Sequence, residues 1–379
     1  MPEGIPPSVG GMRGDGVEVL VVGAGIAGLA AARTLHRWGA TVEIAERAPA
    51  AGVLGTGIYL PGNAVRALDA LGLAEQVSAR AVKIRRQRIA DHRGRFLFDF
   101  EVDEVWRGVG PSLALHRADL HQILLAGAKT VPIRWSCSPV SITDTDDDVR
   151  VDFTDGSSGR YDLVVGADGV HSTVRRLLFG ETASARPVGQ YARRFLAAWP
   201  DAAAEWSLMA GRGTVFLTIP IGDGKVYCYT DCEPGAARLP LHELFADYGE
   251  PVPTLIGASG AAHVHGGPVE EVTLPCWSRG PVLLIGDAAH ATSPNMAEGA
   301  AMALEDAIVL ADTLTGERTI TEALRAYEER RRVRVGWVSA QTHRRDRSRA
   351  LPPAIRNAVL RRTGRRLFAS GYAPLHAQP

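Results

Sequence analysis

The sequence lacks an excess of either charge, because its 379 residues carry 42 Lys and Arg against 42 Asp and Glu. A chain with no net charge has no bulk attraction for nucleic acid or for an anionic surface, so we expect neither as a partner of the molecule as a whole. The apolar fraction of 46% and the charged fraction of 22% are ordinary for a globular protein. A disordered or fibrous chain is therefore excluded.

Cysteine is scarce, and no two cysteines form a CxxC pair. Without a second close Cys or His pair a zinc site is not expected, and no metal is predicted. His263 and His265 stand two residues apart, which fits a partly solvated strand pair better than a metal site. Nothing resembles a secretory peptide, so reduced thiols and a cytoplasmic location are expected. The four cysteines are Cys137, Cys228, Cys232 and Cys276.

The chain also lacks a hydrophobic run long enough to cross a membrane. The longest candidate, residues 17–32, is too short and is interrupted by glycine, which favours a strand, a turn and a helix. We therefore expect no membrane span. Residues 1–16 are rich in Gly and Pro and are expected to form a disordered lead-in.

A glycine-rich turn follows the first apolar run. Gly23, Gly25 and Gly28 form a GxGxxG motif between a predicted strand and a helix of small residues. Each glycine has a physical reason: a tight turn, close approach of the main chain to a pyrophosphate, and close packing of helix on strand. The free N–H groups at the helix N-terminus attract the phosphates. Arg33, on that helix, is a further candidate for a phosphate contact.

An acid at the end of the next strand selects the dinucleotide. Glu46 ends the predicted strand that begins at Thr41, where a carboxylate accepts hydrogen bonds from a ribose 2′-hydroxyl. Because a carboxylate there repels a 2′-phosphate, the resident cofactor is expected to be FAD or NAD and not NADP.

Two further apolar runs end on a glycine and an acid. Asp168 lies in GADGVHSTVR, and Asp287 lies in GDAAHATSP. Together with the GxGxxG motif these acids imply one extended ligand that touches three strand ends. The small residues after Asp287 let a flat ring approach the main chain, and the dipole of the following helix favours negative charge on that ring.

These three motifs, in this order and at roughly these separations, resemble the single-component FAD-dependent aromatic hydroxylases of the p-hydroxybenzoate hydroxylase fold. The resemblance covers most of residues 17–345. It implies an α/β protein: a Rossmann-like FAD-binding domain with an inserted antiparallel β-sheet substrate domain and C-terminal helices. The FAD-binding domain is predicted to comprise residues 17–72, 103–179 and 275–345, the substrate domain residues 73–102 and 180–274, and a C-terminal helical tail residues 346–379.

The resemblance also assigns roles around the cofactor. It implies that Asp287 holds the ribityl chain of FAD. It also implies that the stretch from Gly166 to Arg175, which contains the candidate Asp168, serves both FAD and the visiting NADH or NADPH. Arg117 in LHRADL matches the arginine that lies against the cofactor. Pro294 stiffens the turn, and two of the small residues that follow, Gly299 and Ala300, let the flat ring lie close to the main chain.

The ring-binding loop departs from the family pattern. Relatives commonly have Gly-Gln-Gly followed by Asn two residues later, whereas this chain has Ala297, Glu298 and Gly299, and then Ala301. An acid facing the reduced ring would disfavour it, so we expect the Glu298 side chain to point outwards.

Substrate residues are less determined by the sequence. The strand KVYCYTD resembles the one that lines the substrate pocket in this family, which makes Tyr227 and Tyr229 candidates to orient a ring, although ordinary strand aromatics explain them equally well. The urate-hydroxylating relatives have an arginine where Val215 stands here. This difference disfavours urate as the substrate.

The predicted reaction is NAD(P)H- and O2-dependent hydroxylation of an electron-rich aromatic or enolic small molecule through a flavin C4a-hydroperoxide. A flavin dehydrogenase or reductase of the same superfamily is the alternative, followed by a non-catalytic FAD-binding interaction protein. A monomer or homodimer is expected, without the thioredoxin-like domain of longer relatives. Residues 321–370 carry 14 Arg against four acids, a net charge of +10. A solvated helix face is the simplest interpretation of these arginines.

Overall fold

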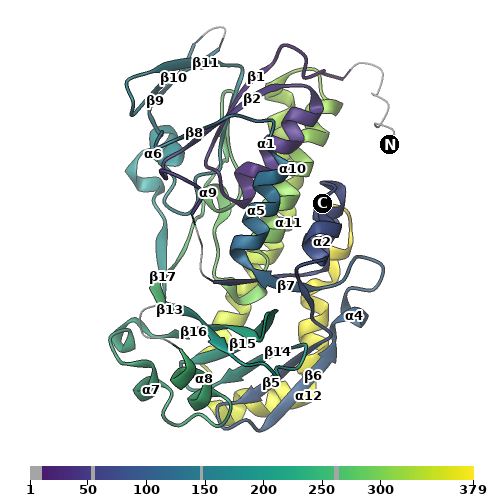
Figure 1. The fold of residues 1–379 in the computed structure, drawn as a ribbon, viewed down its shortest axis with the longest axis vertical. Coiled ribbons are helices and arrows are strands. Elements are labelled where there is room, and N and C mark those ends of the chain that lie inside the picture. Colours follow the sequence, from purple (N-terminus) through teal and green to yellow (C-terminus); the bar gives the residue numbers. More distant parts are fainter. Residues whose placement is uncertain (1–10, 53–55, 146–147, 260–263) are drawn as a thin grey trace.

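The fold is described from a computed structural model of the chain, which describes residues 11–52, 56–145, 148–259 and 264–379. Figure 1 shows two parts stacked along the long axis, with the first strands of the chain in one and most of the segment between residues 186 and 271 in the other. Two long helices, α10 and α11, run along the first part towards the second. None of the helices in the described ranges combines the length and apolar character needed to cross a bilayer.

The first part is built on a six-stranded sheet with the order β18-β19-β12-β1-β2-β8. Its four pairings from β19 to β8 are parallel, and only β18 runs antiparallel to its neighbour. The central strands are apolar on both faces, as expected where helices cover a parallel sheet. Its strands are β1 (Glu18–Val22), β2 (Thr41–Glu46), β8 (Ile133–Trp135), β12 (Leu163–Gly166), β18 (Ser278–Arg279) and β19 (Val282–Leu284).

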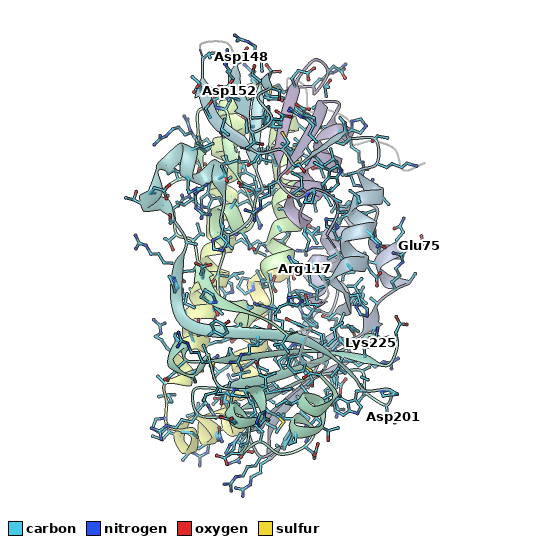
Figure 2. All side chains as sticks on the ribbon, turned by 60° about the vertical axis from the view of Figure 1, so that its left-hand side comes forward. Glu75, Arg117, Asp148, Asp152, Asp201 and Lys225 are labelled. Carbon is cyan, nitrogen blue, oxygen red and sulfur yellow. The ribbon has the colours of Figure 1, made fainter. Side chains whose placement is uncertain are left out.

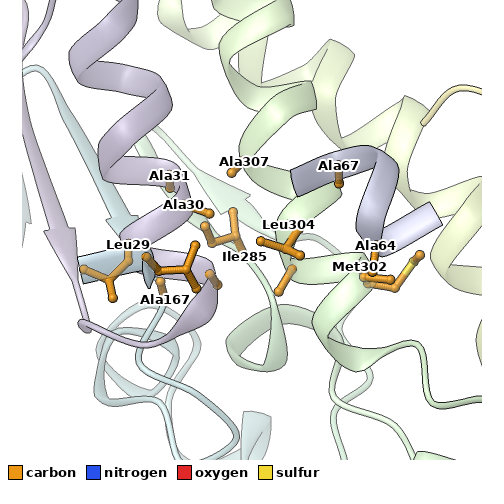
Figure 3. Packing of buried hydrophobic residues seen from close by; sticks show 14 of the residues in the cluster. Leu29, Ala30, Ala31, Ala64, Ala67, Ala167, Ile285, Met302, Leu304 and Ala307 are labelled. Carbon is orange, nitrogen blue, oxygen red and sulfur yellow. The ribbon is translucent and has the colours of Figure 1, made fainter. Parts of the chain in front are cut away.

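Small residues let two helices pack closely beside this sheet. Helix α1 (Ile26–Trp38) packs along α10 (Gly299–Gly316), and Figure 3 shows Ala30 and Ala31 of α1 facing Leu304 and Ala307 of α10. All four side chains are fully buried. The small side chains of α1, the helix that follows the glycine-rich turn, therefore allow it to pack closely against α10, which begins only at Gly299.

The second part is a seven-stranded sheet with the order β17-β13-β16-β15-β14-β5-β6. Its pairings are antiparallel except for β14 with β5, which run parallel. A hairpin around Gly94 supplies β5 and β6, so two separate segments of the chain complete one sheet. Its strands are β5 (Arg86–Asp91), β6 (Phe96–Glu101), β13 (Arg186–Ala198), β14 (Glu205–Ala210), β15 (Val215–Gly222), β16 (Lys225–Cys232) and β17 (His265–Glu271).

Two smaller three-stranded sheets complete the fold. One contains β9 (Pro139–Asp144), β10 (Val149–Phe153) and β11 (Ser158–Tyr161), and the other β3 (Gly57–Leu60), β4 (Val82–Lys83) and β7 (Leu113–His116). The remaining α-helices are α2 (Gly62–Ala70), α3 (Ala74–Ser78), α4 (Val102–Val105), α5 (Arg117–Gly127), α6 (Thr173–Phe179), α7 (Leu241–Leu244), α8 (Val252–Ala258), α9 (Asp287–His290), α11 (Ile320–Arg349) and α12 (Pro353–Tyr372). Short 3-10 turns are η1 (Glu181–Ala183), η2 (Pro234–Ala236), η4 (Pro294–Met296) and η5 (Ala373–His376).

The ends of the chain are tied to the fold more than the sequence suggested. Helix α11 runs without a break across the predicted start of the tail at residue 346, and α12 packs on β6. Part of the predicted lead-in is also anchored, since the Met12 amide donates to the Glu317 carbonyl at 2.9 Å. Residues 1–10 and His263 lie outside the described residues, and in the remainder no cluster of His, Cys, Asp or Glu is arranged to hold a metal.

The simple interpretation of the C-terminal arginines is wrong for part of the set. Arg331, Arg334 and Arg356 are buried, with exposed fractions of 0%, 9% and 6%. They bond to acids and carbonyls within the molecule. The remaining arginines of α12 are exposed.

Candidate functional site

Three strand ends meet at one edge of the six-stranded sheet. The motifs after β1, β12 and β19 are brought together because these strands are neighbours and parallel. The Ala167 amide donates to the Val22 carbonyl, and the Ile285 amide donates to the Gly166 carbonyl. Ligands of open α/β sheets bind at such carboxyl ends. The geometry thus brings the three motifs together at one edge of the sheet, where one extended ligand could touch all of them.

The glycines of the first turn divide into two kinds. A Cβ at Gly28 would lie 1.8 Å from the Gly23 carbonyl oxygen, and one at Gly23 would lie 2.6 Å from the Ala167 oxygen. Gly23 also has a φ of +107°, a conformation that other residues avoid. Gly25, by contrast, faces open space, with no atom within 4 Å of a Cβ. The first two are needed by the fold, whereas Gly25 leaves room for a ligand beside the main chain.

Glu46 is fixed at the end of β2, next to this turn. One carboxylate oxygen accepts a hydrogen bond from the Ala24 amide at 2.7 Å, and the other accepts one from the Ala48 amide at 2.8 Å. The carboxylate is only partly buried. It is therefore held beside the glycine turn by main-chain donors, where a ribose hydroxyl would reach it.

Arg33 makes contacts between segments of the first part. Its guanidinium donates to the carbonyls of Leu71, at 2.8 Å, and Gly127. These bonds join α1 to the ends of α2 and α5. The predicted contact of Arg33 with cofactor phosphates stays a prediction, and we leave this residue out of the proposed cofactor contacts because its donors already have partners.

Asp168 caps a helix of the second motif. Its carboxylate accepts hydrogen bonds from the Ser172 hydroxyl and from the Thr173 and Val174 amides, at 2.6 and 3.1 Å. Burial raises the pKa of Asp168, although these donors favour its ionised form. Within the same motif, Arg175 is 1% exposed and donates to the Ala288 carbonyl at 3.0 Å. The second motif is thereby joined to the third.

Asp287 begins the short helix α9 at the end of β19, and its side chain is exposed at the edge of the sheet. The amide of the preceding Gly286 donates to Asp306 Oδ2 at 2.7 Å. His290, at the other end of α9, bonds to the same oxygen at 2.8 Å. Asp306 thus fixes both ends of the turn and leaves the Asp287 carboxylate available to a ligand.

Sequence reasoning missed the buried ion network beneath this turn. Arg331 of α11 donates to Asp306 at 2.7 Å and to Glu305 at 2.9 Å, and Arg334 donates to Glu305 at 2.7 Å. Although burial opposes ionisation, the charges of His290 and Arg331 hold the pKa of Asp306 well below its ordinary range. The available signal was a pair of adjacent acids in an otherwise apolar helix, since buried acids require partners.

The ring-binding loop is held by α11. Pro294 begins the turn η4, and the next residue, Asn295, accepts a hydrogen bond at its carbonyl from Arg345 at 2.7 Å. The Asn295 side chain donates to Asp346. Ala297 follows with a φ of +55°, in the left-handed region. This conformation explains physically why the family pattern has glycine at that position.

The expectation that Glu298 points outwards is wrong. Its side chain is 2% exposed, and one carboxyl oxygen accepts from Asn63 at 2.8 Å while the other has no partner among the described residues. Burial raises the pKa of Glu298 from 4.5 to about 8. This raised pKa favours the protonated form of Glu298 at neutral pH. A protonated carboxyl is close in shape and hydrogen bonding to the glutamine of the family pattern.

One cavity of about 280 Å³ opens beside this loop. Pro294, Gly299 and Ala300 line it together with Tyr227 and Tyr229, although these groups come from different parts of the fold. The structure therefore places the predicted ring-binding loop opposite the predicted substrate tyrosines. Arg117 also lines this cavity, and Figure 2 shows it between the two parts of the molecule.

Side chains on one face of the second sheet form what we call the substrate floor. Neighbouring strands supply it, because Tyr229 pairs with Leu217, Leu217 with Leu208, and Tyr227 with Ile219. Gly57 packs so tightly on this floor that a Cβ there would lie 2.4 Å from Tyr227 Cβ. The floor comprises Trp206, Leu208, Leu217, Ile219, Tyr227 and Tyr229.

Two polar atoms of this floor are buried without partners in the described part of the chain. They are the indole nitrogen of Trp206 and the hydroxyl of Tyr229. Arg194 lies over the Tyr229 ring, 5.3 Å from its centroid, and burial raises the pKa of both tyrosines, which keeps them neutral. Buried donors that lack partners are costly, so this pair points to a ligand.

The arginines of α11 and α12 that line the cavity all have partners, although Arg345 Nη2 is buried without one in the described part of the chain. Arg349 pairs with Asp231, with one bond of 2.7 Å. Arg356 donates to the carbonyls of Gly211 and Ala210, at 2.6 and 3.0 Å. Arg345 bonds to Asn295 and stacks 4.3 Å from the Phe368 ring centroid. These cations therefore support the walls of the cavity.

Comparison with known proteins adds to this geometry. Residues 16–342 match the model of the "FAD binding domain" family. The chain is 34% identical to the aurachin C monooxygenase/isomerase of Stigmatella aurantiaca, over 83% of this chain and 84% of that protein. It is 35% identical to the 2-heptyl-3-hydroxy-4(1H)-quinolone synthase of Pseudomonas aeruginosa, over 86% of this chain and 88% of the relative.

A solved structure is similar over nearly the whole length. The crystal structure of Klebsiella pneumoniae HpxO complexed with FAD and uric acid superimposes with a TM-score of 0.88 at 26% identity. The match covers 96% of this chain and 97% of that one. It confirms the predicted fold class.

Proposed function

We propose, since the chain belongs to the family of FAD-dependent aromatic monooxygenases, that its own substrate is a neutral nitrogen heteroaromatic of the 4-quinolone type with an apolar substituent. The family assignment confirms an enzyme that uses FAD, with NAD(P)H as the typical reductant. The observation that carries the proposal is the substrate floor, which is apolar and has two uncharged polar atoms without partners.

The residues present fit FAD. The open space at Gly25 and Gly299, where nothing lies within 4 Å of a Cβ, admits a ligand against the main chain. Glu46 would hold the ribose, Asp287 the ribityl chain, and the N-terminus of α10 at Gly299 and Ala300 the ring. Bound FAD accepts hydride from NADH or NADPH and activates O2. The protein orients the ring and excludes water.

The polar atoms of the floor set what the substrate must offer. The Trp206 nitrogen is only a donor, while the Tyr229 hydroxyl both donates and accepts. A keto or enolic oxygen satisfies a donor without requiring a cation. A flat bicyclic ring would lie against Leu208 and Leu217, with Tyr229 placing the reacting ring opposite the loop that contains Gly299.

Acidic and purine substrates fit less well. A benzoate needs a cation beside the floor, and of the cavity arginines Arg349 is paired with Asp231 while Arg356 donates to carbonyls. Arg117 and Arg345, which also line the cavity, are the cations that a benzoate would have to reach. At the position of the arginine of urate hydroxylases, Val215 lines the cavity with an apolar side chain. One of the relatives, the 2-heptyl-3-hydroxy-4(1H)-quinolone synthase, agrees with this preference.

Product analysis tests the proposal. The FAD-loaded protein is mixed with NADH or NADPH and with a 2-alkyl-4-quinolone, a hydroxybenzoate or urate under labelled O2. We expect the quinolone to stimulate NAD(P)H oxidation and to gain one labelled oxygen atom. A preference of about tenfold or more for the hydroxybenzoate or urate would refute the substrate assignment. NAD(P)H oxidation without incorporation of oxygen would favour a reductase.

A matched pair of variants tests the floor. Tyr229→Phe removes only the buried hydroxyl and should raise KM for the quinolone about tenfold, the loss of one buried hydrogen bond. Tyr191→Phe, on β13 and outside the cavity, should leave KM unchanged. Equal effects of the two variants would show that Tyr229 does not contact the substrate.

The remaining assignments extend the same proposal. We place the enzyme in the cytoplasm as a monomer or homodimer, with FAD-binding segments at 17–72, 103–179 and 275–345. Sedimentation and cell fractionation measure both properties.

A further inference from the structure

One exposed face of helix α12 is apolar towards its N-terminus and basic further along the helix. Ile355 and Val359 are 55% and 43% exposed, and Leu351, just before the helix, is 42% exposed. Arg362 and Arg366 continue the line at the three- and four-residue spacing that keeps side chains on one face. Exposed aliphatic residues that are scattered singly need no explanation, but these occupy successive turns.

The charge of this segment is one-sided. Residues 347–379 contain seven arginines and no Asp or Glu, so the zero net charge of the whole chain hides a local excess. Arg365 pairs with Glu104 at 2.6 Å. Arg361, Arg362 and Arg366 have no hydrogen bond or ion pair within the described ranges, and all three are exposed. Nothing intramolecular accounts for these three cations.

The opposite side of α12 belongs to the substrate cavity. Leu360 and Phe368 line it, and Phe368 also packs on Phe98 of β6, with ring centroids 5.1 Å apart. Figure 1 shows α12 beside β6 at the lower end of the molecule, away from the dinucleotide turn. A single helix therefore separates the cavity from the basic and apolar surface.

We propose that this surface of α12, formed by Leu351, Ile355, Val359, Arg362 and Arg366 and called here the α12 face, docks on an anionic phospholipid bilayer. Bilayer headgroups supply the negative charge and the acyl boundary accepts aliphatic side chains, so one partner satisfies both halves. Two copies of the α12 face would bring arginines together without any acid. Nucleic acid offers no favourable surface for Ile355 and Val359.

Docking places the wall of the cavity next to the lipid phase. A substrate with an apolar substituent partitions into that phase, so the α12 face would bring the enzyme to its source. This consequence agrees with the proposed quinolone substrate, but the docking itself is measured without any substrate.

Vesicle sedimentation of the FAD-loaded full chain tests the proposal. We expect binding to phosphatidylcholine vesicles that contain about 30% phosphatidylglycerol, weaker binding at high salt, and no binding to pure phosphatidylcholine. The double variant Arg362→Gln/Arg366→Gln and the double variant Ile355→Ser/Val359→Ser should each reduce binding about fivefold or more. All four side chains are exposed, so retained FAD content verifies the fold.

The matched controls change exposed residues of the same types elsewhere. Arg325→Gln and Val333→Ser, both on α11, should bind vesicles as the unmodified protein does. Absence of binding to anionic vesicles at low salt, or equal binding by the variants of the α12 face and the controls, overturns the proposal. Concentration-dependent self-association that the same variants abolish, without vesicle binding, also overturns it and identifies a contact between copies.

Discussion

The predicted cofactor site and the substrate floor are built in different ways. What we call the cofactor wall, the Gly23–Gly28 turn together with the Pro294–Ala300 loop beside the cavity, consists of main chain and small residues. The substrate floor consists of large side chains on neighbouring strands. The position of the cofactor wall depends on the residues that pack behind its main chain. The shape of the substrate floor depends on the register of its strands. The variants below test that difference.

The largest effect is expected behind the cofactor wall. Arg331→Met removes the one buried cation that bonds to both Asp306 and Glu305, which should lower the free energy of unfolding by about 3–5 kcal/mol. Arg334 and His290 would remain as partners of Glu305 and Asp306. Urea unfolding of the FAD-free protein measures this loss. Arg325→Met, at an exposed site of the same helix, should change stability by less than about 0.5 kcal/mol. A similar loss in both variants would show that the network does not support the wall.

Two alanine substitutions in the Gly23–Gly28 turn should distinguish a glycine that the fold requires from a glycine that FAD requires. Gly28→Ala places a Cβ 1.8 Å from the Gly23 carbonyl and should destabilise the protein by about 3 kcal/mol. Gly25→Ala meets no atom and has an ordinary extended conformation, so the FAD-free protein should remain as stable as the unmodified one. Its FAD affinity should nevertheless fall about tenfold or more. Unchanged FAD affinity in Gly25→Ala would place the cofactor elsewhere.

A pH-dependent effect is expected from Glu298. Its pKa rises from 4.5 to about 8 on folding, so the folded state holds a proton that the unfolded state has lost. Stability therefore falls as pH rises from about 4.5 to about 8. Glu298→Gln removes this decline and should be more stable than the unmodified protein at pH 8 by about 1–3 kcal/mol. Chemical unfolding at pH 5 and pH 8 gives the comparison, and parallel stability curves of the two proteins would contradict it.

The same variant tests the electrostatics of the ring. Because Glu298 is neutral near pH 7, Glu298→Gln should leave FAD binding intact and should shift the flavin reduction potential by less than about 60 mV, or about 1.4 kcal/mol for one electron. A larger shift at pH 7 would mean that a charged carboxylate faces the ring.

The smallest effect is expected at Ala297. Its φ of +55° costs about 1 kcal/mol for a residue with a Cβ, so Ala297→Gly should stabilise the protein by about 0.5–1 kcal/mol. Thermal unfolding detects such a change. Loss of stability would show that the Ala297 methyl packs usefully in the cavity.

The cofactor wall could be predicted from the sequence because its signals are local. A missing Cβ at Gly23 or Gly28 and an acid at a strand end, such as Glu46 or Asp287, can be identified without knowing the fold. The α/β class and the inserted sheet follow from the same motifs. The parallel pairing of β14 with β5 could not be predicted from these motifs, because it joins segments more than 100 residues apart.

Burial of charge explains most of what the sequence left open. Arg331 and Arg366 have the same side chain on consecutive helices, yet one is fully buried and the other exposed. Only the tertiary position of Glu305 and Asp306 distinguishes them. Glu298 was misjudged for the same reason, because the partner that makes its burial tolerable, Asn63, is 235 residues away. Of the substrate floor, the sequence indicated the tyrosines but not Trp206.

The position of β19 in the first sheet has a consequence for biosynthesis. Residues 282–284 pair with β12, the neighbour of the first strand, and Asp306 and Arg331 then secure the turn that follows. On the ribosome the nucleotide groove is therefore incomplete until some 330 residues have emerged. Flavin would be inserted only after these residues have emerged and folded.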